Sequence, residues 1–120
     1  MKKFHYTEIK EEKAEEGAVN TTVRWLIAKD TGAENFAMRL FEINSGGYSP
    51  YHKHPWEHEV FVLDGEGIVR GENCEEKISK GDVLFIPANE NHQLKCTGKA
   101  GHRPGDTGRN RSTTISRLLS

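Results

Sequence analysis

The 120-residue sequence lacks the features that mark a secreted disulfide-rich chain or a membrane protein. It contains only two cysteines, Cys74 and Cys96, without the Cys-x-x-Cys spacing of redox and zinc motifs. Two reduced thiols are therefore expected, and one disulfide stays an alternative. No apolar run is long enough to cross a bilayer, and no apolar segment follows the lysines near the start. We therefore expect a soluble, cytoplasmic protein.

A strong charge of either sign is also lacking. The formal net charge is −1 at pH 7, which gives no electrostatic reason to expect binding to nucleic acid or to a membrane. The charge is unevenly spread, because residues 97–120 contain five Lys or Arg and one acid, Asp106. A chain of this length can bury the core of one domain without disulfide support.

Sustained helical periodicity is absent as well. Short β-branched and apolar segments are separated by turns rich in Gly, Pro, Asn and Asp, a pattern typical of an all-β sandwich or barrel. Residues 45–47 predict a turn, and residues 4–9 predict a weak edge strand at most. Further strands are predicted at residues 21–27, 35–43, 58–63, 68–71, 76–79 and 83–87.

Four of the six histidines are concentrated in two short segments. His52, His54 and His58 fall within seven residues, and His92 follows a second turn-rich segment. Residues two apart on a strand point to the same face, so His52 and His54 can converge, and His58 opens the next apolar strand with the same parity. Imidazole is a common neutral ligand of divalent transition metals. The pattern therefore predicts a metal site built on strands.

The spacing around the first three histidines resembles the first motif of the cupin family, G(X)5HXH(X)3–4E(X)6G. Gly46, His52, His54, His58 and Gly65 reproduce it, with histidine in the place of glutamate. The longer form of the motif would make Glu59 the third ligand instead. After six intervening residues, counting from His58 reaches Gly65, whereas counting from Glu59 reaches Glu66. Strand parity also turns Glu59 outward. His58 is therefore the preferred ligand.

The second cupin motif, G(X)5PXG(X)2H(X)3N, is matched by Gly81, Pro87, Asn89, His92 and Cys96. Two positions depart from it, because Asn89 stands for the second glycine and Cys96 for the final asparagine. Asn adopts the left-handed backbone conformation readily, so the turn can still form. Cys96 is expected to be a small buried residue that removes one hydrogen bond of the motif.

The resemblance, which covers about residues 20–96, implies a jelly-roll β-barrel, also called a double-stranded β-helix, with a metal in its mouth. It is strongest to small, single-domain, manganese-type cupins with four histidine ligands, which are often homodimers. The ligands implied are His52, His54, His58 and His92, with Mn the first choice and Fe, Cu, Ni or Zn as alternatives. Four neutral ligands leave the ion its full +2 charge, which favours anionic or enolate-like oxygen ligands.

The function that the resemblance implies is a metal-dependent dioxygenase or related oxidoreductase. Its partners would be a small-molecule substrate at the barrel mouth and O2, and no further residue is marked as a catalytic acid or base. The alternative is a non-catalytic cupin whose metal is structural or binds a small ligand. The same fold also supports isomerases and decarboxylases, so the fold alone does not select the reaction.

Several residues near the histidines have two interpretations each. Trp56 and Phe85 are expected to be packing residues, although Trp56 could instead wall the pocket. Glu57 and Glu59 are expected to be solvated, or to orient ligand imidazoles through the far N–H. Arg39 either meets an anionic substrate or is an exposed charge.

The C-terminal segment does not follow the family pattern. We predict a division into residues 1–96, the barrel with both motifs, and residues 97–120, an atypical basic and Gly-rich segment. A cupin needs a closing strand after its second motif, and only residues 113–119 could form one, which leaves this strand in doubt. A disordered tail is preferred to a basic arm that binds nucleic acid.

Overall fold

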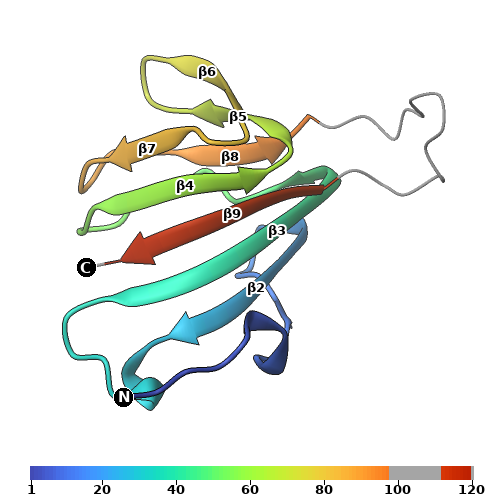
Figure 1. Ribbon diagram of the computed structural model, residues 1–120. Helices are drawn as coiled ribbons and strands as arrows, with labels where there is room; N and C mark the ends of the chain where they lie inside the picture. Colours follow the sequence, from blue (N-terminus) through green and yellow to red (C-terminus); the bar gives the residue numbers. More distant parts are fainter. Residues whose placement is uncertain (98–111, 120) are drawn as a thin grey trace, which may run out of the picture.

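The computed structural model describes residues 1–97 and 112–119. Within these residues the chain forms antiparallel strands and two single-turn 3-10 helices, η1 (Tyr6–Glu8) and η2 (Lys29–Thr31) (Figure 1). The predicted all-β class is thereby confirmed. In chain order the strands are β1 (Glu12–Lys13), β2 (Val19–Ile27), β3 (Ala37–Tyr48), β4 (His58–Asp64), β5 (Glu66–Arg70), β6 (Glu75–Ser79), β7 (Val83–Ile86), β8 (Gln93–Cys96) and β9 (Ser112–Leu119).

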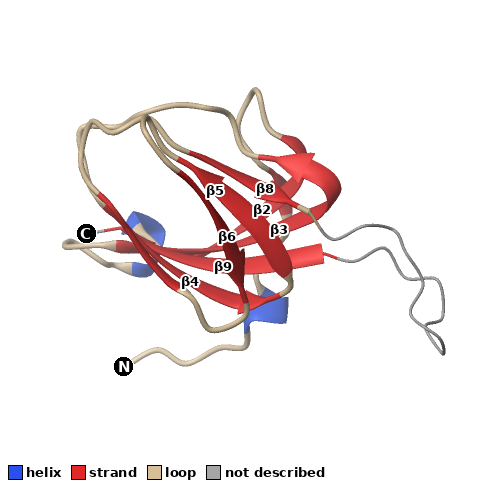
Figure 2. Cartoon of the chain, turned by 90° about the horizontal axis from the view of Figure 1, so that it is seen from above, coloured by secondary structure: helices blue, strands red, loops and turns tan. Residues whose placement is uncertain are grey.

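Strand β3 is where the sheet divides into two layers. One edge of β3 pairs with β2. Its other edge pairs first with β9, over residues 37–44, and then with β8 at Tyr48. Beyond these neighbours the order runs β9-β4-β7 in one direction and β8-β5-β6 in the other. Figure 2 shows the two layers facing each other, an arrangement that fits a jelly-roll barrel.

The long strand β3 continues through the segment that was predicted to turn. Residues 45–47 remain in the strand, and the division between β9 and β8 falls just there. Gly47 is buried, and a Cβ on it would meet the backbone oxygens of Val19 and Asn44 at 2.6 and 2.8 Å. Gly47 therefore permits a close approach of β2 to β3 within the sheet, which local sequence signals do not distinguish from a turn.

The N-terminal segment was also predicted wrongly. Residues 4–9 contain the single 3-10 turn η1 and no edge strand. His5 caps this turn, because its Nδ1 accepts a hydrogen bond from the backbone N–H of Thr7 and its own backbone N–H donates to Glu8. These local hydrogen bonds stabilise a 3-10 turn, and the weak alternation of the sequence does not produce a strand here.

The core lies between the two layers, and the parity of β4 sets its centre. His58, Val60 and Val62 are 0%, 1% and 0% exposed, whereas Phe61 on the opposite face is 45% exposed, so the predicted inward register is confirmed. Cys96 is buried, as predicted, Cys74 is exposed, and neither forms a disulfide within the described residues. The apolar side chains of this core are Val23, Phe41, Ile43, Val60, Val62, Ile78, Ile86, Leu94 and Cys96.

A strand follows the second motif where the sequence left one in doubt. Strand β9 lies between β3 and β4 and pairs with both, so each of these strands has a neighbour on that edge (Figure 1). The preceding basic, Gly-rich run falls on residues 98–111, which lie outside the described residues. The predicted division at residue 96 therefore stays a prediction.

The close approach at Gly47 makes a first testable prediction. Gly47→Ala would place its Cβ against three backbone oxygens at 2.6 to 2.9 Å, so we expect a loss of unfolding free energy of roughly 3 kcal/mol. Gly81→Ala is the matched control, because its Cβ meets nothing within 4 Å and only its positive φ of 93° opposes alanine. The control should lose about 1 kcal/mol in urea unfolding. Equal losses would contradict the steric argument.

Candidate metal centre

The two histidine segments are joined through their backbones. The N–H of His52 donates to the carbonyl of His92 at 3.1 Å, and the N–H of His92 donates to the carbonyl of His52 at 2.8 Å. The N–H of Asn89 donates to the carbonyl of His54 at 2.6 Å. Because these bonds involve only main-chain atoms, they bring together segments 40 residues apart without using the imidazole nitrogens.

Three imidazoles form a compact group of potential ligands. One nitrogen from each of His52, His54 and His92 belongs to a set whose atoms all lie within 4.8 Å of one another. The Nε2 atoms of His52 and His54 are 3.3 Å apart. Two nitrogens bound to one ion at about 2.0–2.1 Å would lie roughly 2.8–3.0 Å apart in cis octahedral geometry and roughly 3.3–3.4 Å apart in tetrahedral geometry. The observed separation therefore fits two ligands of one divalent ion.

The Nδ1 atoms of two of these histidines face acceptors at the rim of the site. Nδ1 of His92 lies 2.9 Å from the carbonyl oxygen of Glu90, and Nδ1 of His52 lies 3.5 Å from the carboxylate of Glu15. A carbonyl can only accept, so Nδ1 of His92 carries the proton, and the carboxylate favours the same tautomer for His52. Both rings then keep the Nε2 lone pair for an ion.

Glu15 is a residue that sequence reasoning missed. It precedes His52 by 37 positions and lies between β1 and β2, so no local spacing connects the two residues. Sequence reasoning instead named Glu57 and Glu59 as groups that could orient the imidazoles. Partial burial, and next the charge of Glu57, raise the pKa of Glu59, which lies on the outward face of β4 as parity predicted.

His58 lies beside the compact group and is completely buried. Its ring centroid is 5.2 Å from that of His54 and 5.1 Å from that of His92. The grouping of nitrogens within 4.8 Å comprises the other three histidines. The structure thus brings all four predicted ligands into one neighbourhood, with His58 as the deepest of them.

The loop between β7 and β8 is held in place next to His92. Glu72 accepts hydrogen bonds from the backbone and side-chain nitrogens of Asn91, both at 3.0 Å, and these bonds lower the pKa of its carboxyl. Asn89 has a φ of 65°, the left-handed conformation expected for the position where the motif has glycine. The hydrogen bonds of Asn91 and the left-handed turn at Asn89 together fix the direction in which the chain passes through His92 into β8.

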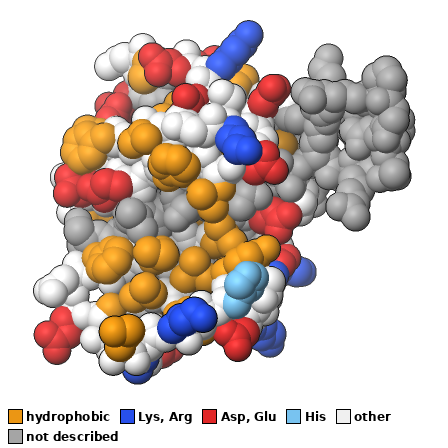
Figure 3. Space-filling model, in the orientation of Figure 1, with side chains coloured by type: hydrophobic (Ala, Val, Ile, Leu, Met, Phe, Trp, Pro, Cys, Tyr) orange, Lys and Arg blue, Asp and Glu red, His pale blue; other side chains and the backbone are white. Residues whose placement is uncertain are grey.

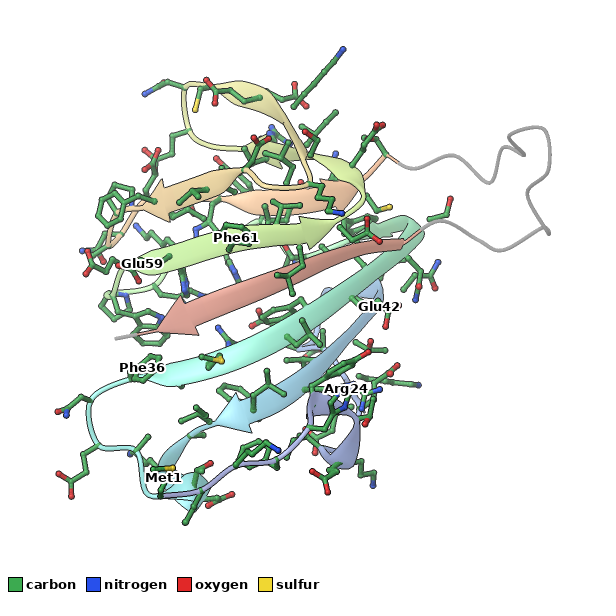
Figure 4. The ribbon with its side chains drawn as sticks, in the orientation of Figure 1. Met1, Arg24, Phe36, Glu42, Glu59 and Phe61 are labelled. Atoms are coloured by element: carbon green, nitrogen blue, oxygen red, sulfur yellow. The ribbon has the colours of Figure 1, made fainter. Side chains whose placement is uncertain are left out.

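A cavity of about 490 Å³ lies between the end of β2, residues 28–37 and Trp56, and none of the four histidines is among its lining residues. Trp56 stacks on His54 with parallel rings 4.7 Å apart and also lines this cavity. Of its two interpretations, a wall residue of a pocket fits this position better than a core packing residue. Phe85, 62% exposed, is not a core packing residue either. In Figure 4, Phe36 at the start of β3 and Glu59 at the start of β4 mark the same end of the molecule. The cavity is lined by Trp25, Ala28, Lys29, Asp30, Ala33, Glu34, Asn35, Phe36, Ala37 and Trp56.

Arg39 is half-buried and is not a freely exposed charge. Its guanidinium carbon lies 4.6 Å from the ring centroid of Trp25 and 4.9 Å from that of Phe41. Its Nε is buried and has no hydrogen-bond partner among the described residues. Burial lowers the pKa of Arg39 to about 10, partly opposed by the charge of Glu15, so the group stays protonated at neutral pH. The barrel mouth therefore contains a cation held between aromatic rings.

Comparison with known proteins agrees with this geometry. The model of the cupin domain matches residues 39–102, which include all four histidines. The chain belongs to the cupin family. A histidine cluster in such a fold suggests that this cupin binds a divalent metal ion, and the identity of the ion is open.

The relatives of this cupin differ in activity. The structure of the polyketide cyclase RemF from Streptomyces resistomycificus is 30% identical, with a TM-score of 0.84, and the match covers 99% of this chain and 78% of that one. An oxalate-binding protein from Thermotoga maritima is 34% identical over 64 residues, half of this chain and 53% of the relative. An acireductone dioxygenase from Leptospira biflexa is 39% identical over 49 residues, 38% of this chain and 28% of the relative. The cupin thus spans about half or less of the curated relatives it matches.

Neither short helix of this cupin, within the described residues, is long and apolar enough to cross a membrane.

The contact between Glu15 and His52 leads to a second prediction. Glu15→Gln removes the negative charge that favours the Nδ1-protonated tautomer of His52. We expect Mn²⁺ affinity to fall about threefold to tenfold. The loss is small for a group that orients a ligand imidazole, because the carboxylate is partly exposed. The affinity can be measured from the electron paramagnetic resonance signal of free Mn²⁺.

Glu16→Gln is the control for that measurement. It removes an equal charge one residue away, and Glu16 is also exposed. An equal loss of affinity in both variants would show that only the general charge of the loop matters.

Proposed function

We propose that this cupin is a metal-dependent enzyme that acts on a small molecule, with His52, His54, His58 and His92 as the metal ligands. The observation that carries the proposal is the convergence of imidazole nitrogens from two segments. Manganese is the first choice from the resemblance to manganese-type cupins, with Fe, Cu, Ni or Zn as alternatives. A bound ion would supply a positive centre that polarises substrate oxygens and stabilises negative charge developing on them.

The residues of the chain support such chemistry in three ways. Glu15 and the carbonyl of Glu90 hold imidazole rings in one tautomer and orientation. Trp56 covers one face of His54 and limits the access of water to it. Complete burial of His58 among core side chains fixes the floor of the site. The site is thus preorganised before a substrate arrives.

Two reaction classes are compatible with this site. The first is ring closure or another carbon–carbon rearrangement through an enolised carbonyl, favoured by the likeness to RemF over 99% of this chain and 78% of that one, and by a ligand set without carboxylates. The second is the dioxygenase or oxidoreductase activity proposed from the sequence, favoured by the shorter match to acireductone dioxygenase. The match to an oxalate-binding protein supports the alternative, a non-catalytic cupin that binds a small ligand.

Cytoplasmic location and a homodimer also stay predictions. In support of a dimer, Phe61 and Leu63 of β4 and Val83 and Phe85 of β7 are exposed apolar side chains, with Phe61 paired in register with Val83. Figure 3 shows hydrophobic side chains gathered on the face that is seen in Figure 1.

The metal site makes a third prediction. Protein purified without an affinity tag should contain close to one transition-metal ion per chain by elemental analysis, and His54→Ala or His92→Ala should lower this content at least about tenfold. His5→Ala is the matched control, because His5 is an exposed histidine that caps η1 far from the cluster in sequence. Equal metal content in all four proteins would refute the proposed ligands.

A fourth prediction separates the reaction classes. If enolisation is the common step, the metal-loaded protein should speed the exchange of the carbon-bound protons of a β-dicarbonyl compound such as 1-phenyl-1,3-butanedione with D2O, above the rate in buffer and equally with and without O2. Loss of the compound that depends strictly on O2, followed with an oxygen electrode and matched anaerobic absorbance, would favour the dioxygenase. Turnover in neither condition, over a panel of β-dicarbonyls and α-hydroxyketones, would favour the non-catalytic alternative.

A further inference from the structure

We propose that Arg39 is a specificity-determining residue that binds an acidic group of the ligand, separate from the oxygen donors that a histidine-bound ion would hold. The ligand is then a small acid with a chelating end and a second anionic group further along the molecule. The inference rests on the proposed function, because it assigns a second contact to the ligand of the same site.

Arg39 points into the space between the two layers of the barrel. On β3 it has the same parity as Phe41 and Ile43, which are 7% and 1% exposed. Across β9, the register of β3 continues from Arg39 to Val60, which is buried on the inner face of β4. Arg39 therefore belongs to the inner wall, where a cation needs an explanation other than solubility.

The histidine segments lie in the layer opposite Arg39. The N–H of Ser49 donates to the carbonyl of Leu94, and His52 and His92 exchange two further bonds, so residues 49–52 continue the layer that contains β8. Arg39 lies in the layer that contains β9, and Figure 2 shows that the two layers face each other. Facing sheets are about 10 Å apart, and a long arginine side chain spans much of such a gap. One small molecule can therefore contact both layers.

Glu15 connects Arg39 to the histidine cluster independently of the strand register. Its carboxylate lies 3.5 Å from Nδ1 of His52, and its charge also acts on Arg39, where it partly opposes the effect of burial on the pKa. Electrostatic interactions between charges are largely screened beyond about 8–10 Å in physiological salt. A carboxylate that contacts His52 and also acts on Arg39 therefore places the guanidinium in the neighbourhood of the candidate ligands.

The guanidinium of Arg39 is suited to bind a further oxygen group. Its carbon lies 4.6 Å and 4.9 Å from the ring centroids of Trp25 and Phe41, contacts that limit how far the group can turn. Its Nε is buried and has no hydrogen-bond partner among the described residues, which costs stability. The N–H donors of a guanidinium form a planar fork that matches a carboxylate, so a ligand carboxylate would offset this cost.

Electrostatics select the charge of that ligand group. Four neutral imidazoles would leave a bound divalent ion its full charge, and Arg39 is a second cation in the same barrel, so the two would repel each other. A ligand with negative charge at both ends lowers this repulsion. A ligand with an apolar end beside Arg39 would leave the repulsion and the buried Nε uncompensated. Arg39 should therefore discriminate between acids of equal size.

The test uses three chelating probes and the full-length protein loaded with Mn²⁺. The probes are malate, 2-hydroxybutanoate, which has a methyl group in place of the second carboxylate, and glycolate, which has the chelating end alone. We expect isothermal titration calorimetry to show that malate binds about tenfold more tightly than 2-hydroxybutanoate. Arg39→Met should reduce this preference to about twofold or less and change glycolate binding less than twofold. Arg39→Lys, which keeps the charge without the fork, should retain a preference of about threefold.

Arg24→Met is the matched control. Arg24 is also a partly buried arginine over an aromatic ring, 5.6 Å from the ring centroid of Tyr6, but it has the opposite parity to the buried Val23 and pairs with Glu11. This variant removes an equal charge and should keep the full preference for malate.

Two results would overturn the inference and leave the metal site standing. One is equal binding of malate and 2-hydroxybutanoate by the Mn²⁺-loaded wild-type protein. The other is an equal loss of affinity for all three probes in Arg39→Met, which would mean that Arg39 only supports the fold. If the wild-type protein takes up no Mn²⁺ and binds no probe, the proposed function fails first and this inference fails with it.

Discussion

The candidate site depends on one constraint, the backbone pairing of the two histidine segments. His52 and His92 exchange two main-chain hydrogen bonds, and Asn89 adds a third to His54. Each segment alone is a loop after a strand and could take many orientations. Once the main chains are paired, the imidazoles project from a common rigid edge, and entropy that metal binding would otherwise cost has been lost already during folding.

A second level of order comes from the nitrogens that face away from the centre. Nδ1 of His92 is held by a carbonyl, and Nδ1 of His52 faces a carboxylate. These contacts choose the tautomer and aim Nε2 inward, so that the 3.3 Å separation between the Nε2 atoms of His52 and His54 suits one shared ion. The floor of the site is the buried His58, which is part of the same inward row as Val60 and Val62. Core packing and the candidate metal centre therefore share one strand face.

The side chains around Arg39 and the cavity lined by Trp25, Phe36 and Trp56 are arranged less favourably for the stability of the folded chain. Three aromatic rings remain partly exposed there, and the charged group of Arg39 is kept among rings instead of in water. Both features are unfavourable for an isolated folded chain, since apolar area stays hydrated and a charge is partly desolvated. Trp56 is the residue that touches both regions, because it stacks on His54 and also lines the cavity with Trp25.

The sequence by itself determined the all-β class and the inward register of β4, and it predicted that the four histidines lie close together, because strand parity and motif spacing are local properties. The turn at Asn89 also followed from the tolerance of Asn for a left-handed backbone. Residues 45–47 could not be read as strand, since Gly47 is required by a neighbouring backbone and not by a turn. The approach of Glu15 to His52, the aromatic rings on either side of Arg39 and the cavity lined by Trp25 and Trp56 were decided only by the tertiary structure. Each joins residues whose separation along the chain carries no periodic signal, so pairing of the strands alone brings them together.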